Sequence, residues 1–518
     1  MPPYLLATWQ NELSKHLRSS SYNWRVHHGA TRIKDITQVN SVDIVLTTYP
    51  ILANESAKDP SGVLFSCKWH RVVLDEAHGI KSLTTKTAKA AYRLKADRRW
   101  VVTGTPIQNH VSELGSLLSF LGVFPYSDPE TFKEQIIRPW KAGKTELVFE
   151  RLKCLLNFVM LRRSQDLISL PQRTDLKIFL KLGESERRTY DEIKGQVLRC
   201  IDDLVFDTMT REEKMNALQK INSLRLICTV GVSGSHKTSS LALADFSTDT
   251  TWDENAALGG LRRLPLLGVP VACQICDDLL DISDESASVY LTECLQVCCL
   301  CCYDNLRSNF SLTSVSHCEC FSPCPTIKVP LNRISSPPIE DIRYGQNFRF
   351  PTKIHSLLSD LKENGRNVKS LVFSYWKSTL DLANSALDQS GIRCIQVDGR
   401  TKAKDRSAKF KQFTEREDIS VLLLSLSCGS TGLTLTAASR AYLMEPQWNP
   451  SIEEQALARI YRIGQTKEVE NIRFIMEDTI EKYVENVQDN KKDLVTLLLS
   501  GSSQSITEQR LQELRNAL

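Results

Sequence analysis

The stretch Val72-Val73-Leu74-Asp75-Glu76-Ala77-His78 joins an apolar run to two consecutive acidic residues. An apolar run of this kind predicts a short buried strand, and ligands of parallel α/β sheets bind where such strands end. Carboxylates at that point can hold a magnesium ion and orient a water molecule for attack on a phosphate. The stretch therefore predicts half of an ATP-hydrolysing site, with Asp75 as the magnesium ligand and Glu76 as the residue that positions the water.

Apolar runs on either side of this stretch alternate with segments of helical character. Alternating strands and helices predict an α/β fold with a parallel sheet. The same alternation returns after Pro351, so we expect two α/β lobes that a long insert separates. The expected strands cover residues 42–49, 71–74 and 100–102 in the first lobe and residues 370–373, 394–397, 421–424 and 441–444 in the second. The expected helices include residues 86–94, 152–163, 184–226, 353–361 and 505–518.

The composition is typical of a globular protein of several domains. The chain has 518 residues, of which 42% are hydrophobic and 24% are charged, and its net charge is +4. This balance alone does not favour a nucleic-acid partner, so any basic groove must be local. No apolar run approaches the length of a membrane span, and the N-terminus lacks the basic and apolar regions of a signal peptide.

Two further segments extend the catalytic pattern. Thr103-Gly104-Thr105-Pro106-Ile107-Gln108-Asn109 follows the third expected strand, and the segment from Gln455 to Gln465 lies in the second lobe. The latter carries Arg459 and Arg462 at a spacing that predicts one helix face. Arginines at this spacing are ordinarily surface residues, but arginines that reach across a cleft stabilise charge on a transferring phosphoryl group. In this company we expect both arginines to complete the catalytic site.

No glycine-rich phosphate loop precedes the acidic pair in this sequence. Such a loop needs Gly, four residues and Gly-Lys-Ser/Thr, so that backbone amides cradle the phosphates. Gly143-Lys144-Thr145 is the only such tripeptide, but Arg138 stands at the first glycine position and the segment follows the acids. Two explanations stay open. One is a gene model or transcript that begins too late, which the surviving catalytic segments favour; the other is a degenerate protein that no longer hydrolyses ATP.

These segments, in this order, resemble the motifs of the Swi/Snf-type DNA-dependent ATPases of helicase superfamily two. The matching segments are Pro3 to Glu12, His28-Gly29 with Arg32, Asp75 to His78, Thr103 to Asn109, Leu161 to Arg163 with Leu170-Pro171, Val372 to Ser374 with Trp376, Asp398-Gly399 with Arg406, Ser425 to Leu435, and Trp448 to Pro450 with Gln455 to Gln465. Ser430 and Thr434 depart from the glycine and asparagine that the family carries in its fifth motif.

The resemblance implies two RecA-like lobes that clamp double-stranded DNA, with ATP and Mg²⁺ in the cleft between them. It implies catalytic roles for Glu76, Arg459 and Arg462. Contacts to ATP or its magnesium are implied for Asp75, His78, Gln455 and Gly432. Coupling of the ATP site to DNA is implied for Thr103, Gly104, Thr105, Gly429, Trp448 and Asn449. Basic residues that we expect near DNA phosphates, or alternatively on an ordinary solvated surface, are Arg32, Lys81 and Arg400.

The cysteines are concentrated in the insert. Ten of the 16 fall between Cys273 and Cys324, and paired thiols favour a tetrahedral zinc site over buried or free thiols. Their order resembles a degenerate RING finger, with Gln296 where a histidine ligand is expected. One branch of the family, which includes the helicase-like transcription factor and post-replication repair translocases, carries a RING between its lobes. The expected zinc ligands are Cys273, Cys276, Cys294, Cys299, Cys302, Cys320 and Cys324, and Cys298 or His317 could substitute as a ligand.

The expected domains follow from these segments: an incomplete ATP-binding lobe (1–170), a helical linker with a Ser/Thr-rich insert (171–262), the Cys-rich insert (263–330), a linker (331–350), the helicase C-terminal lobe (351–500) and a final helix (501–518). The expected function is an ATP-dependent DNA translocase in repair or chromatin-linked transcription, located in the nucleus. Nucleosomes or a ubiquitin-conjugating enzyme are further expected partners, and no membrane is. The alternative is a non-hydrolysing DNA- or protein-binding scaffold, or a remnant of a ubiquitin ligase.

Overall fold

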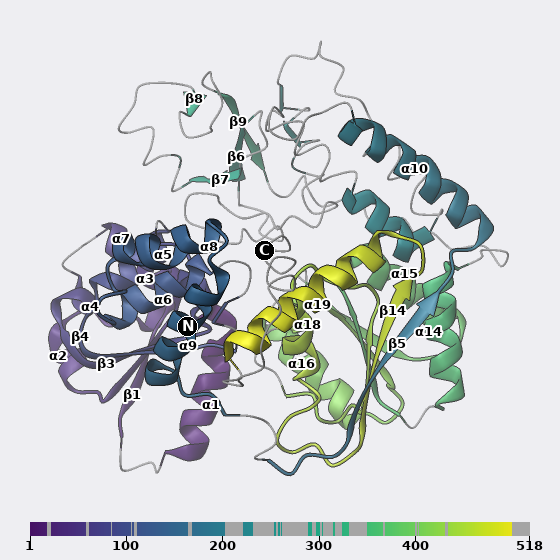
Figure 1. Cartoon of the computed structure of the whole chain (residues 1–518). Coiled ribbons are helices and arrows are strands. Elements are labelled where there is room, and N and C mark those ends of the chain that lie inside the picture. The colour runs from purple at the N-terminus through teal and green to yellow at the C-terminus, as the bar shows by residue number, and fades with distance from the viewer. Residues whose placement is uncertain are drawn as a thin grey trace.

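The chain forms two α/β parts with a small antiparallel sheet above them, as the computed structural model shows (Figure 1). The structure describes most residues of both α/β parts and a few short stretches of the Cys-rich insert. The described residues are 1–17, 22–58, 62–83, 85–104, 106–107, 111–163, 168–202, 221–231, 253–254, 257–258, 261, 288–292, 297–300, 303, 314–315, 324–330 and 350–499 without 366–367, 399–400, 402 and 430–433.

The N-terminal part, residues 1–159, contains two pairs of parallel strands. β1 (Trp24–His27) pairs with β2 (Ile44–Thr47), and β3 (Lys68–Asp75) pairs with β4 (Lys95–Val102). Helices and turns pack around these pairs: η1 (Pro3–Leu5), α1 (Leu6–His16), η2 (Gly29–Thr31), α2 (Ile36–Asn40), α3 (Tyr49–Lys58), α4 (Val63–Ser66), η3 (Ala77–Ile80), α5 (Lys86–Arg93), α6 (Ser112–Leu121), α7 (Pro129–Phe132), η4 (Lys133–Ile137), α8 (Arg138–Lys141) and α9 (Thr145–Val159).

The helix α5 shows how the sequence builds this part. Thr85 is its N-cap, because the hydroxyl oxygen of Thr85 accepts a hydrogen bond from the backbone N–H of Ala88 at 3.2 Å. Ala88, Ala90 and Ala91 are fully buried, so their small side chains let the helix lie close to its neighbours. The expected helix at residues 86–94 is thereby confirmed. α9 ends at Val159, four residues before the predicted end.

The C-terminal part contains a six-stranded, wholly parallel sheet in the order β11-β12-β10-β13-β14-β5. Helices cover both faces, which explains why every residue of β10 and β12 is buried. Its elements are β5 (Arg173–Leu180), α10 (Glu184–Asp202), α14 (Thr352–Glu363), β10 (Ser370–Ser374), α15 (Lys377–Gln389), β11 (Cys394–Val397), α16 (Ala403–Glu415), β12 (Val421–Ser425), α17 (Leu426–Gly429), β13 (Arg440–Leu443), α18 (Pro450–Leu457), β14 (Val469–Met476) and α19 (Ile480–Leu499). The sheet confirms the α/β expectation.

The strand β5 differs from the sequence-based expectation, which placed residues 171–262 in a helical linker. β5 pairs with β14 over its whole length and forms one edge of the sheet, alongside β14 in Figure 1. Two polar contacts hold it there. The guanidinium of Arg173 lies 3.0 Å from the carboxylate of Glu454, and the side-chain amide of Asn471 donates to Asp175 at 2.7 Å. The chain therefore joins the C-terminal sheet well before residue 351.

A helical pair follows β5 and packs on the same part. α10 and a helix at residues 221–231 enclose an apolar cluster with Met476 at the end of β14. The buried members of this cluster are Tyr190, Ile193, Val197, Leu224, Ile227, Cys228 and Met476. The expected helical character of residues 184–226 is confirmed for both described segments.

The described residues of the Cys-rich insert include a four-stranded antiparallel sheet, in the order β7-β6-β9-β8. Its strands are β6 (Ser288–Thr292), β7 (Val297–Cys299), β8 (Ser314–Val315) and β9 (Cys324–Pro330). The expected final helix at 505–518 lies outside the described residues. None of the helices within the described ranges is long and apolar enough to cross a membrane.

Candidate functional site

Asp75 is the last residue of β3, and its carboxylate is held from two sides. The indole N–H of Trp9 donates to Oδ2 at 2.6 Å, and the backbone N–H of Glu76 donates to Oδ1 at 2.9 Å. The hydroxyl of Tyr49 also donates to the backbone carbonyl of Asp75 at 2.8 Å. These bonds fix the acid at the carboxyl end of the strand, where a parallel sheet places its ligands. Each carboxylate oxygen retains a lone pair for a metal-bound water.

Glu76 has a left-handed backbone, with φ 48° and ψ 56°. This conformation is unfavourable for a residue with a side chain, and strain of this kind concentrates at functional sites. Oε2 of Glu76 lies 3.3 Å from Nδ1 of His78, without hydrogen-bond geometry. Both atoms are buried and lack a hydrogen-bond partner among the described residues. Glu76 thus has a carboxylate oxygen that no hydrogen bond within the described residues uses, and a general base for water needs such an acceptor.

The two α/β parts meet beside this acid pair. Thr103 and Gly104 follow β4, and a Cβ built on Gly104 would lie 3.9 Å from the side-chain nitrogen of Gln455 in α18. The predicted residues Gly104 and Gln455, from two separate motifs, thus lie close to each other across the junction. α19 also contacts α9, as the yellow helix that reaches the N-terminal part in Figure 1 shows. Burial lowers the pKa of Lys491 in α19, and the nearby carboxylate of Glu113 in α6 raises it.

Arg459 and Arg462 do not lie on a helix, so the predicted common helix face is wrong. α18 ends at Leu457, and the following residues form turns. The reason is a competing backbone bond: the carbonyl of Arg459 accepts from the N–H of Leu435 at 2.9 Å. Both arginines are partly buried, at the end of α18 that carries Gln455. Their catalytic role stays a prediction.

Trp448 and Asn449 directly precede α18. The side-chain oxygen of Asn449 accepts from the N–H of Ser451 at 3.1 Å, which makes Asn449 the N-cap of the helix. The backbone carbonyl of Trp448 accepts from the ammonium group of Lys491 at 3.2 Å. The structure therefore gives both residues a role in placing α18, and hence Gln455.

Glu445 is an acidic residue at the carboxyl end of the C-terminal sheet that sequence reasoning missed. It follows β13 by two residues and is 1% exposed. Its carboxylate accepts hydrogen bonds from the hydroxyl of Ser374 and the N–H of Tyr375, both at the end of β10. Burial raises its pKa to about 7. An acid directly after an apolar strand was a readable signal, since the same pattern singled out Asp75.

The remaining predicted residues are placed only in part. Gly429 ends α17, and His78 lies in η3. Thr105, Gly432, Arg400 and the expected zinc ligands Cys273, Cys276, Cys294, Cys302 and Cys320 lie outside the described residues, as does the side chain of Cys324. Cys299 is partly buried in β7. Within the described ranges, no three His, Cys, Asp or Glu residues gather as metal ligands do.

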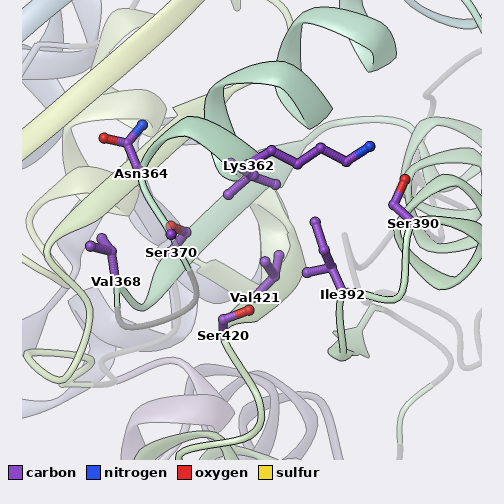
Figure 2. A pocket seen from close by; sticks show the side chains of 10 residues that line it. Lys362, Asn364, Val368, Ser370, Ser390, Ile392, Ser420 and Val421 are labelled. Atoms are coloured by element: carbon purple, nitrogen blue, oxygen red, sulfur yellow. The ribbon is translucent and has the colours of Figure 1, made fainter.

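A cavity of about 270 Å³ lies at the amino ends of the central strands of the C-terminal sheet (Figure 2). Ser370 and Val421, which line it, are the first residues of β10 and β12. Parallel sheets bind their ligands at the carboxyl ends of strands, whereas this cavity lies at the amino ends. The cavity is therefore a poor candidate for a nucleotide site. Its other lining residues are Leu361, Lys362, Asn364, Gly365, Val368, Ser390, Ile392 and Ser420.

An acidic pair at the end of a parallel strand, close to a second α/β part, is typical of the helicase-like class of proteins. Comparison with known families gives the particular group. The SNF2-related domain matches residues 1–230, and the helicase conserved C-terminal domain matches residues 352–464. The chain therefore carries an SNF2-related domain and a helicase C-terminal domain, and the Swi/Snf-type resemblance is confirmed.

Curated relatives match the chain nearly end to end. It is 31% identical to DNA repair protein RAD5A of Arabidopsis thaliana over 99% of this chain and 51% of the relative. It is 32% identical to the mouse (Mus musculus) helicase-like transcription factor over 95% of this chain and 50% of the relative. The chain thus spans about half the length of these relatives. A solved structure entitled Sulfolobus solfataricus SWI2/SNF2 ATPase core in complex with dsDNA is 20% identical over 100% of this chain and 85% of that chain, with a TM-score of 0.34.

Proposed function

We propose that this chain is the motor region of an ATP-dependent DNA translocase that acts in DNA repair or chromatin-linked transcription. The observation that carries the proposal is the junction: Gly104 after β4 faces Gln455 of α18, beside the acids that end β3. In a translocase, ATP hydrolysis must change the relation between two lobes, so motifs from both must meet at the acid site. The relatives named DNA repair protein and helicase-like transcription factor support the same reading.

The residues present fit one half of a magnesium–ATP site. Magnesium, when bound with ATP, neutralises charge on the phosphates and polarises them for attack. Asp75 is anchored by Trp9 and has oxygens available for metal-bound water. The buried Oε2 of Glu76, which lacks a hydrogen-bond partner among the described residues, is placed to accept a proton from an attacking water. We assign to Arg459 and Arg462 the stabilisation of phosphoryl charge from the C-terminal part.

The phosphates need a further component. A glycine-rich loop with a lysine cradles them in motor ATPases, and the 518 residues of this chain contain none. The chain spans about half of its relatives' length. The tests below therefore use the longest protein that the gene encodes, called the full-length product, with the 518-residue chain beside it. Two RecA-like lobes that clamp double-stranded DNA are the arrangement that we propose for the working protein.

The insert adds a second component to this proposal. We assign a zinc site to its cysteines, in a RING-like arrangement that would contact a ubiquitin-conjugating enzyme. We also propose a nuclear location and a nucleosome partner; relatives named DNA repair protein and helicase-like transcription factor support the nuclear location. Metal analysis of the purified chain tests the zinc site: close to one or two zinc ions per chain is the expected result, and a metal-free chain that folds normally rules the site out.

Translocation itself is tested by displacement of a third strand from a DNA triplex. A protein that tracks along a duplex removes the third strand only while it hydrolyses ATP. The expected result is displacement that needs ATP and stops when the protein carries Glu76→Gln. Hydrolysis of ATP without displacement would make the chain an ATPase that does not translocate, and neither activity would favour the scaffold alternative.

A further inference from the structure

Arg225 is a buried cation between two tryptophans of the C-terminal part. It belongs to the helix at residues 221–231 and is 3% exposed. Its guanidinium lies over the rings of Trp376, at 4.9 Å from the centroid, and Trp448, at 5.5 Å. Its Nη2 donates a hydrogen bond to the backbone carbonyl of Pro446 at 2.8 Å. One side chain therefore contacts both Trp376, at the start of α15, and the loop before α18.

Burial of this guanidinium costs more free energy than the burial of an apolar side chain. Burial lowers the pKa of Arg225, while the carboxylates of Glu445 and Glu481 raise it. Its Nε has no hydrogen-bond partner among the described residues. A guanidinium that is taken out of water in this way is held by the faces of the aromatic rings and by nearby carboxylates. Lysine has neither the planar group nor the paired donors to replace it.

The loop that Arg225 contacts leads through α18 to the junction. Residues 446–449 are the last part of the connection from β13 to α18, and the N–H of Gln447 donates to the carboxylate of Glu453 in that helix, at 2.7 Å. α18 in turn carries Gln455, which faces Gly104 of the N-terminal part. Only α18 therefore separates the contact of Arg225 with the loop from the junction.

We propose that Arg225 is a positioning residue: it fixes the loop 446–449, and through α18 it fixes where Gln455 meets Gly104. The placement of the junction then depends on the helix at 221–231, which lies outside the catalytic segments and from which the chain continues toward the Cys-rich insert. The inference deepens the proposed function, and its effect on ATP turnover rests on that function. Its effect on the loop does not.

Hydrogen–deuterium exchange tests the effect on the loop in the folded chain. Arg225→Lys keeps the charge and removes the planar contact, so we expect exchange in residues 445–457 to rise at least about fivefold, with β10 and β12 unchanged. Arg187→Lys is the matched control, because Arg187 also lies over a ring, that of Tyr190 at 5.4 Å, but does not touch the loop. Unchanged exchange in 445–457, or an equal rise throughout the C-terminal part, overturns the inference.

A second variant covers the case in which Arg225→Lys does not fold. Trp448→Leu removes one of the two rings and is expected to raise exchange in the same segment. Adding Arg225→Lys to Trp448→Leu is expected to raise it by less than the sum of the two single effects, since the two residues share one of the contacts that hold the loop. A fully additive double variant overturns the inference, as does a Trp448→Leu chain with wild-type exchange.

Kinetics separate a positioning role from a merely structural one. In the full-length product, we expect Arg225→Lys to lower kcat of DNA-stimulated ATP hydrolysis about tenfold, with KM for ATP within about twofold. A wild-type kcat would overturn the link to the junction. If the wild-type protein does not hydrolyse ATP, the proposed function fails, whereas the exchange experiment still decides the role of Arg225 at the loop.

Discussion

Glu76 serves two requirements at once, and its backbone shows the conflict between them. The residue must aim a carboxylate beyond the end of β3, yet a left-handed φ of 48° is unfavourable for any side chain with a Cβ. Asp75 and Trp9 fix the peptide that precedes it, so the turn has no freedom to relax. The stability that is lost in this turn is consistent with a residue kept for chemistry.

Glu76→Gly is therefore expected to raise the stability of the chain by about 0.5–1 kcal/mol and to abolish ATP turnover. Glycine adopts the left-handed region freely, but it has no carboxylate. Thermal unfolding measures the first effect. Asp478→Gly is the control, since Asp478 has φ 53° and follows β14 in the C-terminal part. It should stabilise the chain and leave turnover intact; a Glu76→Gly chain that is less stable than the wild type contradicts the account of strain.

Glu445 gives the stability a pH dependence of defined sign. Its pKa in the folded protein is about 7, against an ordinary value of 4.5. Between these values the folded state binds a proton that the unfolded state lacks, so the contribution of Glu445 to stability is complete below about pH 4.5 and is lost as the pH rises through about 7. Burial is the cause, because ionisation leaves a charge out of contact with water.

Glu445→Gln is expected to remove this dependence. The amide stays neutral, so the variant gains on the order of 2 kcal/mol relative to wild type between pH 5 and pH 8. Unfolding by urea at several pH values measures the difference. Glu415→Gln, at an exposed position of α16, should show no such trend. A constant difference between Glu445→Gln and wild type across this range would show that Glu445 does not titrate there.

At the scale of elements, β5 is the strand that sequence reasoning missed. Its sequence Arg-Thr-Asp-Leu-Lys-Ile-Phe-Leu carries three charges, so it does not read as the continuous apolar run of a central strand. An edge strand needs less burial, and its charged residues find partners in the sheet. Arg173 and Asp175 contact Glu454 and Asn471, which lie nearly 300 residues away in the sequence. Such contacts are not visible to local patterns.

Ile178→Pro tests the importance of this edge. Proline at this position removes a donor from the ladder with β14 and imposes a fixed φ, so we expect a loss of about 3 kcal/mol or more in the stability of the C-terminal part. Ile178→Val keeps the strand geometry and should lose about 1 kcal/mol. Calorimetry distinguishes them, and equal unfolding temperatures for the two variants would mean that β5 is not an integral strand.

The predicted strands at 370–373, 394–397, 421–424 and 441–444 match β10 to β13 within one residue at each end, because buried parallel strands are continuous apolar runs. The prediction that Arg459 and Arg462 lie on a helix was wrong for the opposite reason. Their spacing is helical, but a long-range bond from Leu435 to the carbonyl of Arg459 decides the local conformation. Local spacing cannot reveal such a partner.

At the scale of the whole molecule, the sequence predicted the acid pair and the motifs but not their meeting. Asp75 and Glu76 were readable because an apolar strand precedes them. The approach of Gly104 to Gln455 depends on how two separately folded parts pack, and the left-handed turn at Glu76 depends on what surrounds it. The roles of Arg225 and Trp9 likewise come from tertiary contacts that no short motif encodes.

DNA binding by the assembled parts should be electrostatic. A translocase contacts phosphates rather than base edges, and each neutralised phosphate releases a counterion, so affinity falls as salt rises. We expect the affinity of the full-length product for a duplex to fall at least about tenfold between 50 and 200 mM salt, with little sequence preference. Fluorescence anisotropy with two unrelated duplexes measures both. An affinity that is flat with salt would contradict a phosphate-tracking motor.

The central claim is that Glu76 activates water in a DNA-stimulated ATPase, and one comparison tests it most directly. ATP hydrolysis by the full-length product is measured with and without duplex DNA, for wild type, Glu76→Gln and the exposed control Glu130→Gln. The account predicts hydrolysis that DNA stimulates, a fall of about 10²- to 10⁴-fold in Glu76→Gln and no change in Glu130→Gln. Equal hydrolysis by wild type and Glu76→Gln, or a wild type that does not respond to DNA, would contradict it.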